Sequence, residues 1–230
     1  MTHVLYTYLT DDDNDSFFVN AEHRFSADFV SKYSKYKRWQ DAKSTVLGRL
    51  LLAYGLKNLY QVDVDDLKIS FSKDKKPFLE NSSIQFNISH SKDVIVCAIT
   101  SVGEIGVDVE KINDINIQDF KDQFSQTEYE SINASANALE QFFTFWTQKE
   151  AVVKSNGAGL HIPLNSFDIA NNFTLIGNTP YHLKEIVLDP EYKCHMATEQ
   201  LIFNDNMTVT KISSTILSDF MSVNSFKLFL

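Results

Sequence analysis

The sequence predicts an α+β fold with two halves, each placing helices before antiparallel strands. Two helical patterns, Phe29–Arg38 and Asp41–Gly55, precede a series of short strand patterns in the first half. One long helical pattern, Ala138–Asn156, precedes a second series of strand patterns. The 230 residues suffice for one large domain or two small ones. We therefore expect two similar halves, residues 1–102 and residues 103–230.

Apolar spacing defines the elements of the first half. The helix at Asp41–Gly55 carries an apolar stripe at helical spacing, formed by Val46, Leu47, Leu50, Leu51 and Tyr54. Lys76 precedes Pro77, so the chain is expected to be extended there. Strands are predicted at Val4–Leu9, Leu67–Phe71, Ile84–Ser89 and Val94–Thr100.

The second half begins with a clear strand at Ile105–Glu110, in which apolar residues alternate with Gly106, Asp108 and Glu110. The segment from Ser125 to Glu128 has the pattern of a capping box that starts a short helix. Gly157 or Gly159 is expected to end the long helix. Further strands are predicted at Phe167–Ala170, His182–Val187, Lys193–Thr198 and Met207–Ile212.

The composition is that of a soluble globular protein, with 43% apolar and 22% charged residues. Apolar runs are too short to cross a bilayer, and the N-terminus lacks the features of a secretory signal. Cys97 and Cys194 are the two cysteines, so neither a disulfide framework nor a structural zinc site is expected. We expect a reduced, cytoplasmic protein with no membrane partner.

The charge distribution bears on the ligand. A net charge of −9 disfavours nucleic acid as a partner. Basic residues nevertheless gather between Asp28 and Arg49, where only Asp28 and Asp41 oppose Lys32, Lys35, Lys37, Arg38, Lys43 and Arg49. Such a cluster suits a compact polyanion, but taken alone it is better explained as a solvated helix face.

Two carboxylates form the sharpest local feature. Asp108 and Glu110 are two residues apart on a strand and so lie on one side of it. They form either an exposed strand face or a site for a hard cation such as Mg²⁺, to which Glu150 of the long helix could add a third oxygen. Glu150 and Lys154 are themselves four residues apart, which also fits a simple surface ion pair on a helix.

One histidine stands out in the segment Phe86–Ser91, FNISHS. His90 ends a strand between two serines, which fits either a phosphate contact or a structural role. Sequence signatures of P-loops, dinucleotide-binding folds, zinc proteases and serine hydrolases are absent. The six histidines also lack the paired spacing of a zinc site.

Five segments in order resemble the motif series of the Sfp-type 4′-phosphopantetheinyl transferases. They are KRWQDAKSTVLGRLLL, KKPFL, FNISHS, IGVDVEKI and FWTQKEAVVKSNGAGL, and the match runs from about Lys37 to Pro163. The chain departs from the pattern at Lys75, where the family has glycine, and the basic residues before Asp41 match only loosely.

The resemblance implies a pseudo-dimer of two α+β halves with coenzyme A (CoA) in the cleft between them. It implies Mg²⁺-dependent transfer of the 4′-phosphopantetheine arm of CoA to a serine of an acyl or peptidyl carrier protein, with release of adenosine 3′,5′-bisphosphate. A monomer is expected. Two alternatives are a non-catalytic module that binds CoA or a carrier protein, and another Mg²⁺-dependent phosphotransferase.

The resemblance also assigns residues. Those implied as metal ligands are Asp108, Glu110 and Glu150, of which Asp108 and Glu150, together with Lys154, are implied as catalytic. Contacts with CoA are implied for Lys32, Lys35, Thr45, Lys76, Ser89, His90 and Lys154.

Overall fold

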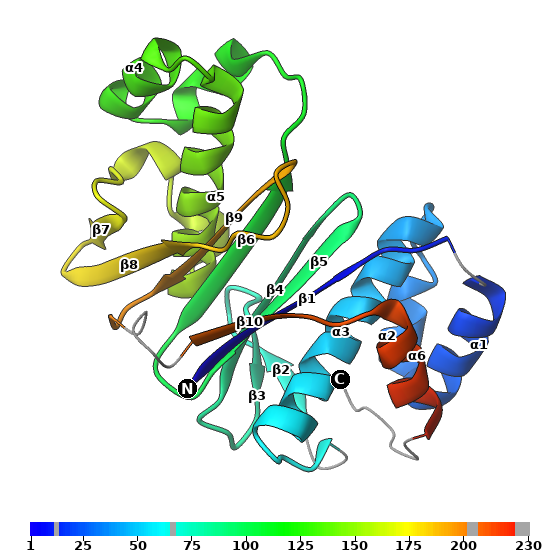
Figure 1. Cartoon of the computed structure of the whole chain (residues 1–230). Coiled ribbons are helices and arrows are strands. Elements are labelled where there is room, and N and C mark those ends of the chain that lie inside the picture. Colours follow the sequence, from blue (N-terminus) through cyan, green and yellow to red (C-terminus); the bar gives the residue numbers. More distant parts are fainter. Residues whose placement is uncertain (12–13, 65–67, 202–206, 224–230) are drawn as a thin grey trace.

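The computed structural model describes residues 1–11, 14–64, 68–201 and 207–223. It has an α+β architecture with two sheet-containing halves, which confirms the predicted fold class (Figure 1). The helices are α1 (Asn14–Arg24), α2 (Ala27–Tyr33), α3 (Trp39–Leu59), α4 (Gln126–Ala134), α5 (Ala138–Asn156) and α6 (Ser214–Val223), with short 3₁₀ turns η2 (Ile117–Gln123), η3 (Gly159–His161) and η4 (Leu164–Ser166). No helix among the described residues is both long and apolar enough to cross a membrane.

Two four-stranded sheets form the centre of the molecule. The first has the order β10-β1-β5-β4, from β1 (Thr2–Tyr8), β4 (Gln85–Ser91), β5 (Val94–Thr100) and β10 (Met207–Lys211). The second has the order β6-β9-β8-β7, from β6 (Ile105–Lys111), β7 (Phe173–Ile176), β8 (Thr179–Glu185) and β9 (Tyr192–Thr198). A separate hairpin pairs β2 (Ile69–Phe71) with β3 (Pro77–Leu79).

Three of the four apolar cores found among the described residues hold these layers together. One core joins α1, α2, α3 and α6 to one face of the first sheet. The opposite face of that sheet packs through Val4 and Val96 against Val107 and Met196 of the second sheet. A third core joins α5 to the far face of the second sheet, through residues such as Val152 and Tyr181. The two halves are therefore joined by buried apolar surface, which favours a fixed relative position.

Side chains of β4 connect the edge of the first sheet to β6 of the second. Asn87, Ser89 and Ser91 accept hydrogen bonds from the backbone N–H groups of Val107, Val109 and Lys111, at 2.9, 3.4 and 3.2 Å. Because the bonded positions advance in the same direction, β4 and β6 run parallel here. We call this row of contacts the β4–β6 seam.

Gly106 allows α5 to lie directly on β6. A Cβ atom at this position would be 2.1 Å from the carbonyl oxygen of Ala151 and 2.3 Å from the backbone nitrogen of Ser155. No real Cβ approaches backbone atoms so closely. The alternation of β6 then places Asp108 and Glu110 on the same face as Gly106, toward α5.

Several predicted elements agree closely with the structure. Helix α5 spans the predicted Ala138–Asn156, and Gly157 ends it with φ of 83° and an N–H donated to Val153. Both hydrogen bonds of the capping box between Ser125 and Glu128 are formed at the start of α4. The predicted strand at Leu67–Phe71 is formed at Ile69–Phe71, while Leu67 lies outside the described residues.

Other predictions were wrong. The helix predicted at Phe29–Arg38 ends at Tyr33. The segment Phe167–Ala170 forms no strand, because side chains satisfy its backbone: Lys149 donates to the carbonyl of Phe167, and Glu128 accepts from the N–H of Ile169. The apolar alternation there reflects burial beside α5 rather than a ladder.

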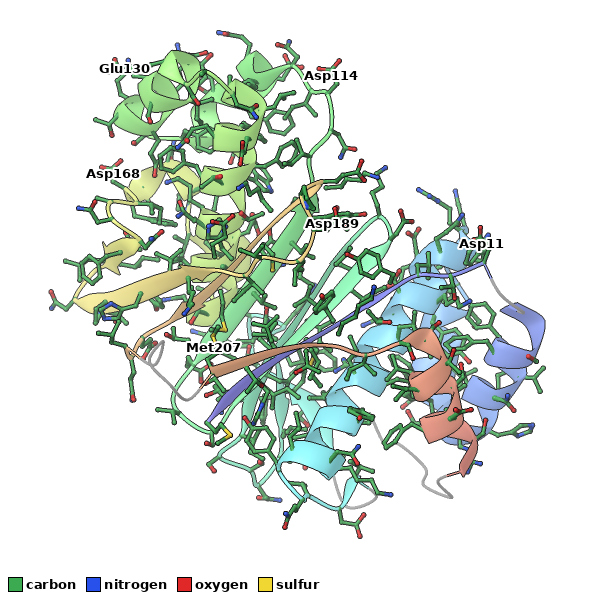
Figure 2. All side chains as sticks on the ribbon, in the orientation of Figure 1. Asp11, Asp114, Glu130, Asp168, Asp189 and Met207 are labelled. Carbon is green, nitrogen blue, oxygen red and sulfur yellow. The ribbon has the colours of Figure 1, made fainter. Side chains whose placement is uncertain are left out.

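The C-terminal segment contributes to the first half. Strand β10 pairs in parallel with β1, and Met207 at its start lies beside β1 (Figure 2). Helix α6, which the sequence analysis did not predict, packs its Leu217 and Phe220 into the first core. Helix α1 was likewise not predicted.

Candidate active site

A cleft of about 650 Å³ lies between the two halves. The first half contributes Lys76 and Asn87 to its wall, and the second contributes Trp146, Glu150 and Lys154. This volume is typical of a small-molecule site. Three of the residues assigned from the motifs, Lys76, Glu150 and Lys154, line the cleft directly, and the others lie behind its wall or away from it.

Asp108 is the most buried carboxylate of the site, with 3% of its surface exposed. Its Oδ1 accepts from Lys154 Nζ at 2.5 Å and from Ser89 Oγ at 3.0 Å. Its Oδ2 is buried and has no hydrogen-bond partner among the described residues. Burial raises the pKa of Asp108, while Lys154 and Ser89 oppose the rise. An unpartnered oxygen of this kind is costly unless a cation or donor reaches it.

Glu110 and Glu150 are half-buried near Asp108. Glu110 Oε2 accepts from Ser91 Oγ at 2.6 Å. The Glu150 side chain makes no hydrogen bond and no ion pair within the described part of the chain. It interacts with Asp108 and Lys154 only through their charges, at longer range. Burial raises the pKa of both glutamates, and the negative charge of Asp108 adds to each rise. The three carboxylates therefore repel one another, and extra positive charge nearby would stabilise them.

Lys154 is the cation that faces these carboxylates. Its Nζ lies 2.5 Å from Asp108 Oδ1 and 3.0 Å from Ser89 Oγ. As the side chains stand, the described residues contain no group of three or more His, Cys, Asp or Glu side chains that could hold a metal ion. Glu150 and Lys154 thus share one face of α5, but Lys154 pairs with Asp108 on β6.

The residues assigned to CoA contacts lie in several places. Ser89 and His90 point to opposite sides of β4: Ser89 is buried at Asp108, and His90 is exposed near Asp41 at the start of α3. Thr45 Oγ1 donates to the Asp41 carbonyl at 2.8 Å. Desolvation of the ring by the surrounding protein lowers the pKa of His90, and the positive charge of Lys154 adds to this effect.

The remaining assigned lysines differ in how they are held. Lys76 Nζ is 2.5 Å from Glu104 and 2.7 Å from the carbonyl of Ser155, so it ties the hairpin β2–β3 to the end of α5. Lys32 and Lys35 are exposed, and the Lys32 ammonium lies 5.7 Å from the ring centre of Phe71. Neither of these two lysines lines the cleft.

The motif around Glu150 has a structural function as well, which the sequence analysis missed. Lys149 is fully buried, 2.8 Å from Glu128 Oε2, and donates to the carbonyls of Leu164 and Phe167. It therefore holds the chain after α5, including Leu164 in the cleft wall. A lysine three residues after Trp146 and next to Glu150 gave no signal of burial, because its partners are distant in sequence. Trp146 is half-buried: it stacks on Phe142 of a neighbouring apolar core and also lines the cleft.

His195 of β9 bonds to Thr147 of α5 and so ties this helix to the second sheet. It is 1% exposed, and its Nδ1 lies 2.8 Å from Thr147 Oγ1. Burial lowers the pKa of His195 to about 4. An unfolded histidine titrates near 6.5, so the stabilisation from neutral His195 is complete above that pH and is lost as the pH falls toward 4.

We therefore expect His195→Gln to reduce the loss of stability on acidification. The difference between the pKa of His195 in the folded and unfolded states corresponds to a loss of about 3 kcal/mol of unfolding free energy between neutral pH and pH 4. Gln keeps a hydrogen-bonding group near Thr147 but does not titrate. Urea unfolding at pH 7 and pH 4.5 measures the difference. Equal losses in the variant and the wild type would show that His195 does not govern the acid response.

Comparison with known proteins identifies the family. A family model described as "4′-phosphopantetheinyl transferase superfamily" matches residues 104–203, and another described as "4′-phosphopantetheinyl transferase, N-terminal" matches residues 17–102. The chain is 30% identical over 213 residues to 4′-phosphopantetheinyl transferase Sfp of Bacillus subtilis, a match covering 87% of this chain and 92% of that protein. The chain belongs to the 4′-phosphopantetheinyl transferase superfamily.

Other 4′-phosphopantetheinyl transferases are similar to this chain. The transferase gsp of Aneurinibacillus migulanus is 34% identical, with 78% of each chain covered. The L-aminoadipate-semialdehyde dehydrogenase-phosphopantetheinyl transferase of Xenopus laevis is 29% identical, with 73% of this chain and 61% of that protein covered. The family and the enzyme class expected from the motif series are confirmed.

Proposed function

We propose that this phosphopantetheinyl transferase moves the 4′-phosphopantetheine arm of CoA to a serine of an acyl or peptidyl carrier protein. The reaction is Mg²⁺-dependent and releases adenosine 3′,5′-bisphosphate. The observation that carries the proposal is the group of Asp108, Glu110, Glu150 and Lys154 at the cleft between the halves.

The donor chemistry of these residues fits a divalent cation, although as the side chains stand among the described residues they do not yet form a group of three ligands around one point. Asp108 Oδ2 is buried without a partner, and Glu150 lacks a hydrogen bond or ion pair among the described residues. Carboxylate oxygens are the ligands that Mg²⁺ prefers, and substrate phosphate commonly completes its coordination. Asp108, Glu110 and Glu150 would hold the ion. When bound, Mg²⁺ supplies neutralisation of the CoA pyrophosphate and polarisation of the phosphate under attack.

The chain's own groups carry the remaining tasks. Lys154 has a flexible ammonium 2.5 Å from Asp108, and we assign it to the phosphates of CoA. Phosphoryl transfer requires mainly positioning and charge neutralisation, which a cation held at the cleft provides. Glu150, whose pKa burial raises, is the proposed base for the serine proton, directly or through a water molecule.

The 3′-phosphate is assigned to His90. His90 is exposed beside Asp41, close to the N-terminus of α3. The side chain of Arg38, the residue before this helix, makes no hydrogen bond to its first N–H groups. A free helix N-terminus attracts phosphate. Further CoA contacts are proposed for Lys32, Lys35, Thr45, Lys76 and Ser89.

Mass spectrometry tests the proposed reaction directly. An apo carrier protein incubated with the enzyme, CoA and Mg²⁺ should gain the mass of one phosphopantetheine. Omission of Mg²⁺ with added chelator should abolish the gain. A carrier protein that binds but gains no mass would indicate the non-catalytic binding module. Transfer from a nucleotide in place of CoA would indicate the other phosphotransferase.

We expect His90→Ala to remove most of the preference for CoA over 3′-dephospho-CoA. The substitution removes a contact with the phosphate that distinguishes these two substrates, so kcat/KM should fall for CoA and change little for the dephosphorylated form. His182→Ala, on β8 and outside the cleft lining, is the control. Unchanged discrimination would return His90 to a structural role.

A further inference from the structure

Ser91 links the two halves at a carboxylate of the site. Its Oγ accepts from the backbone N–H of Lys111 at 3.2 Å and donates to Glu110 Oε2 at 2.6 Å. Ser91 ends β4 in the first half, whereas Glu110 and Lys111 lie on β6 in the second. The hydroxyl therefore bonds at once to the backbone and to the carboxylate of the same strand.

The neighbouring seam residues show that this arrangement is specific. Ser89 makes the same pair of bonds two residues earlier, accepting from the N–H of Val109 and donating to Asp108. Ser89 also accepts a hydrogen bond from Lys154 Nζ. Within the described part of the chain, the Asn87 side chain bonds to the backbone of Val107 and to no carboxylate. Lys154 can therefore help to orient Asp108, whereas Ser91 provides the one hydrogen bond to the Glu110 side chain among the described residues.

This bond matters because electrostatic repulsion favours conformations in which the Glu110 carboxylate points away from the site. It is half-buried beside two like charges, Asp108 and Glu150, which repel it. A glutamate without a fixed partner samples several rotamers, most of which would point its oxygens elsewhere. A partner that holds one carboxylate oxygen leaves the other available to a ligand.

We infer that Ser91 is a positioning residue that orients Glu110 for a divalent cation at the cleft. The inference rests on the proposed function, since it assumes that Glu110 binds the metal. Because Ser91 and Glu110 come from different halves, the cation site would also depend on the alignment of the two halves along the β4–β6 seam. Partners of metal-binding carboxylates commonly change metal affinity about 10–100-fold when removed.

Titration of Mn²⁺ in the presence of CoA, followed by electron paramagnetic resonance, tests the inference without using turnover. Ser91→Ala should weaken Mn²⁺ binding about tenfold or more, and Ser91→Thr, which keeps the hydroxyl, should restore most of the affinity. If Ser91→Ala fails to fold, Ser91→Cys, which keeps the volume but weakens the donor, takes its place with the same expectation.

A double-mutant cycle separates positioning from general structural support. In a Glu110→Gln background, Ser91→Ala should cause little further loss of Mn²⁺ affinity, since its effect passes through Glu110. An equal loss in both backgrounds would overturn the inference and indicate a loosened seam. Wild-type affinity in Ser91→Ala would overturn it as well, with the proposed metal site intact. Absence of Mn²⁺ binding by the wild-type enzyme would overturn both the inference and the proposed metal site.

Discussion

Asp108→Ala and Glu150→Gln are each expected to lower kcat by on the order of 10² or more. Each change removes one carboxylate from the proposed metal site, so that charge on the pyrophosphate is left uncompensated in the transition state. Steady-state transfer to an apo carrier protein measures the effect. The double variant should be little worse than the poorer single variant, because residues that act as a unit are grossly non-additive.

Stability separates this account from a structural explanation. Without metal, Glu150→Gln removes one of three mutually repelling carboxylates, so its melting temperature should be unchanged or slightly higher. Asp108→Ala removes the partner of Lys154 as well, so Glu150→Gln is the cleaner test. Melting at a much lower temperature, with activity lost in proportion, would indicate that these groups form a structural ion-pair network.

Lys149→Met is expected to destabilise the protein by about 3–5 kcal/mol. Lys149 is fully buried and Glu128 is 3% exposed, so the substitution leaves a buried carboxylate without its cation. It also removes the donor to the carbonyls of Leu164 and Phe167. Urea unfolding gives the free energy, and the double variant with Glu128→Gln should recover part of the loss.

Lys193→Met provides the matched control. Lys193 pairs with Glu140 and Glu185, which are each 46% exposed, so its removal should cost no more than about 1 kcal/mol. A loss in Lys149→Met as small as that in Lys193→Met would contradict the structural assignment of Lys149. Lys149 would then have a function other than holding the chain that follows α5.

The parts of the fold that sequence predicts well have strong local signals. Helix α5 has a full apolar pattern and a terminal glycine, and β6 alternates apolar and polar residues, so both were located closely. The alternation also placed Asp108 and Glu110 on one side of the strand. The family motifs assigned Asp108 and Lys154 to one catalytic site, and these two side chains are in contact at 2.5 Å.

The parts that sequence could not predict depend on contacts between distant segments. Pairing of β10 with β1 joins the two ends of the described chain, and no local pattern specifies it. The apolar alternation of Phe167–Ala170 looks like a strand, but side chains of Lys149 and Glu128 bond to the backbone of Phe167 and Ile169, and Ala170 makes only an isolated bridge to Phe173. In the sequence Ser91 is an ordinary polar residue, and its bond to Glu110 becomes visible only when β6 is placed beside β4.

Calorimetric titration of Mg²⁺ in the presence of CoA, on the wild type and Glu150→Gln, tests the central claim most directly. The claim is that carboxylates of β6 and α5 together hold a divalent cation against the phosphates of CoA. We predict measurable binding by the wild type and an affinity lower by about tenfold or more in Glu150→Gln. Identical affinity in the two proteins would contradict the claim and leave Glu150 as a helix surface residue one turn before Lys154.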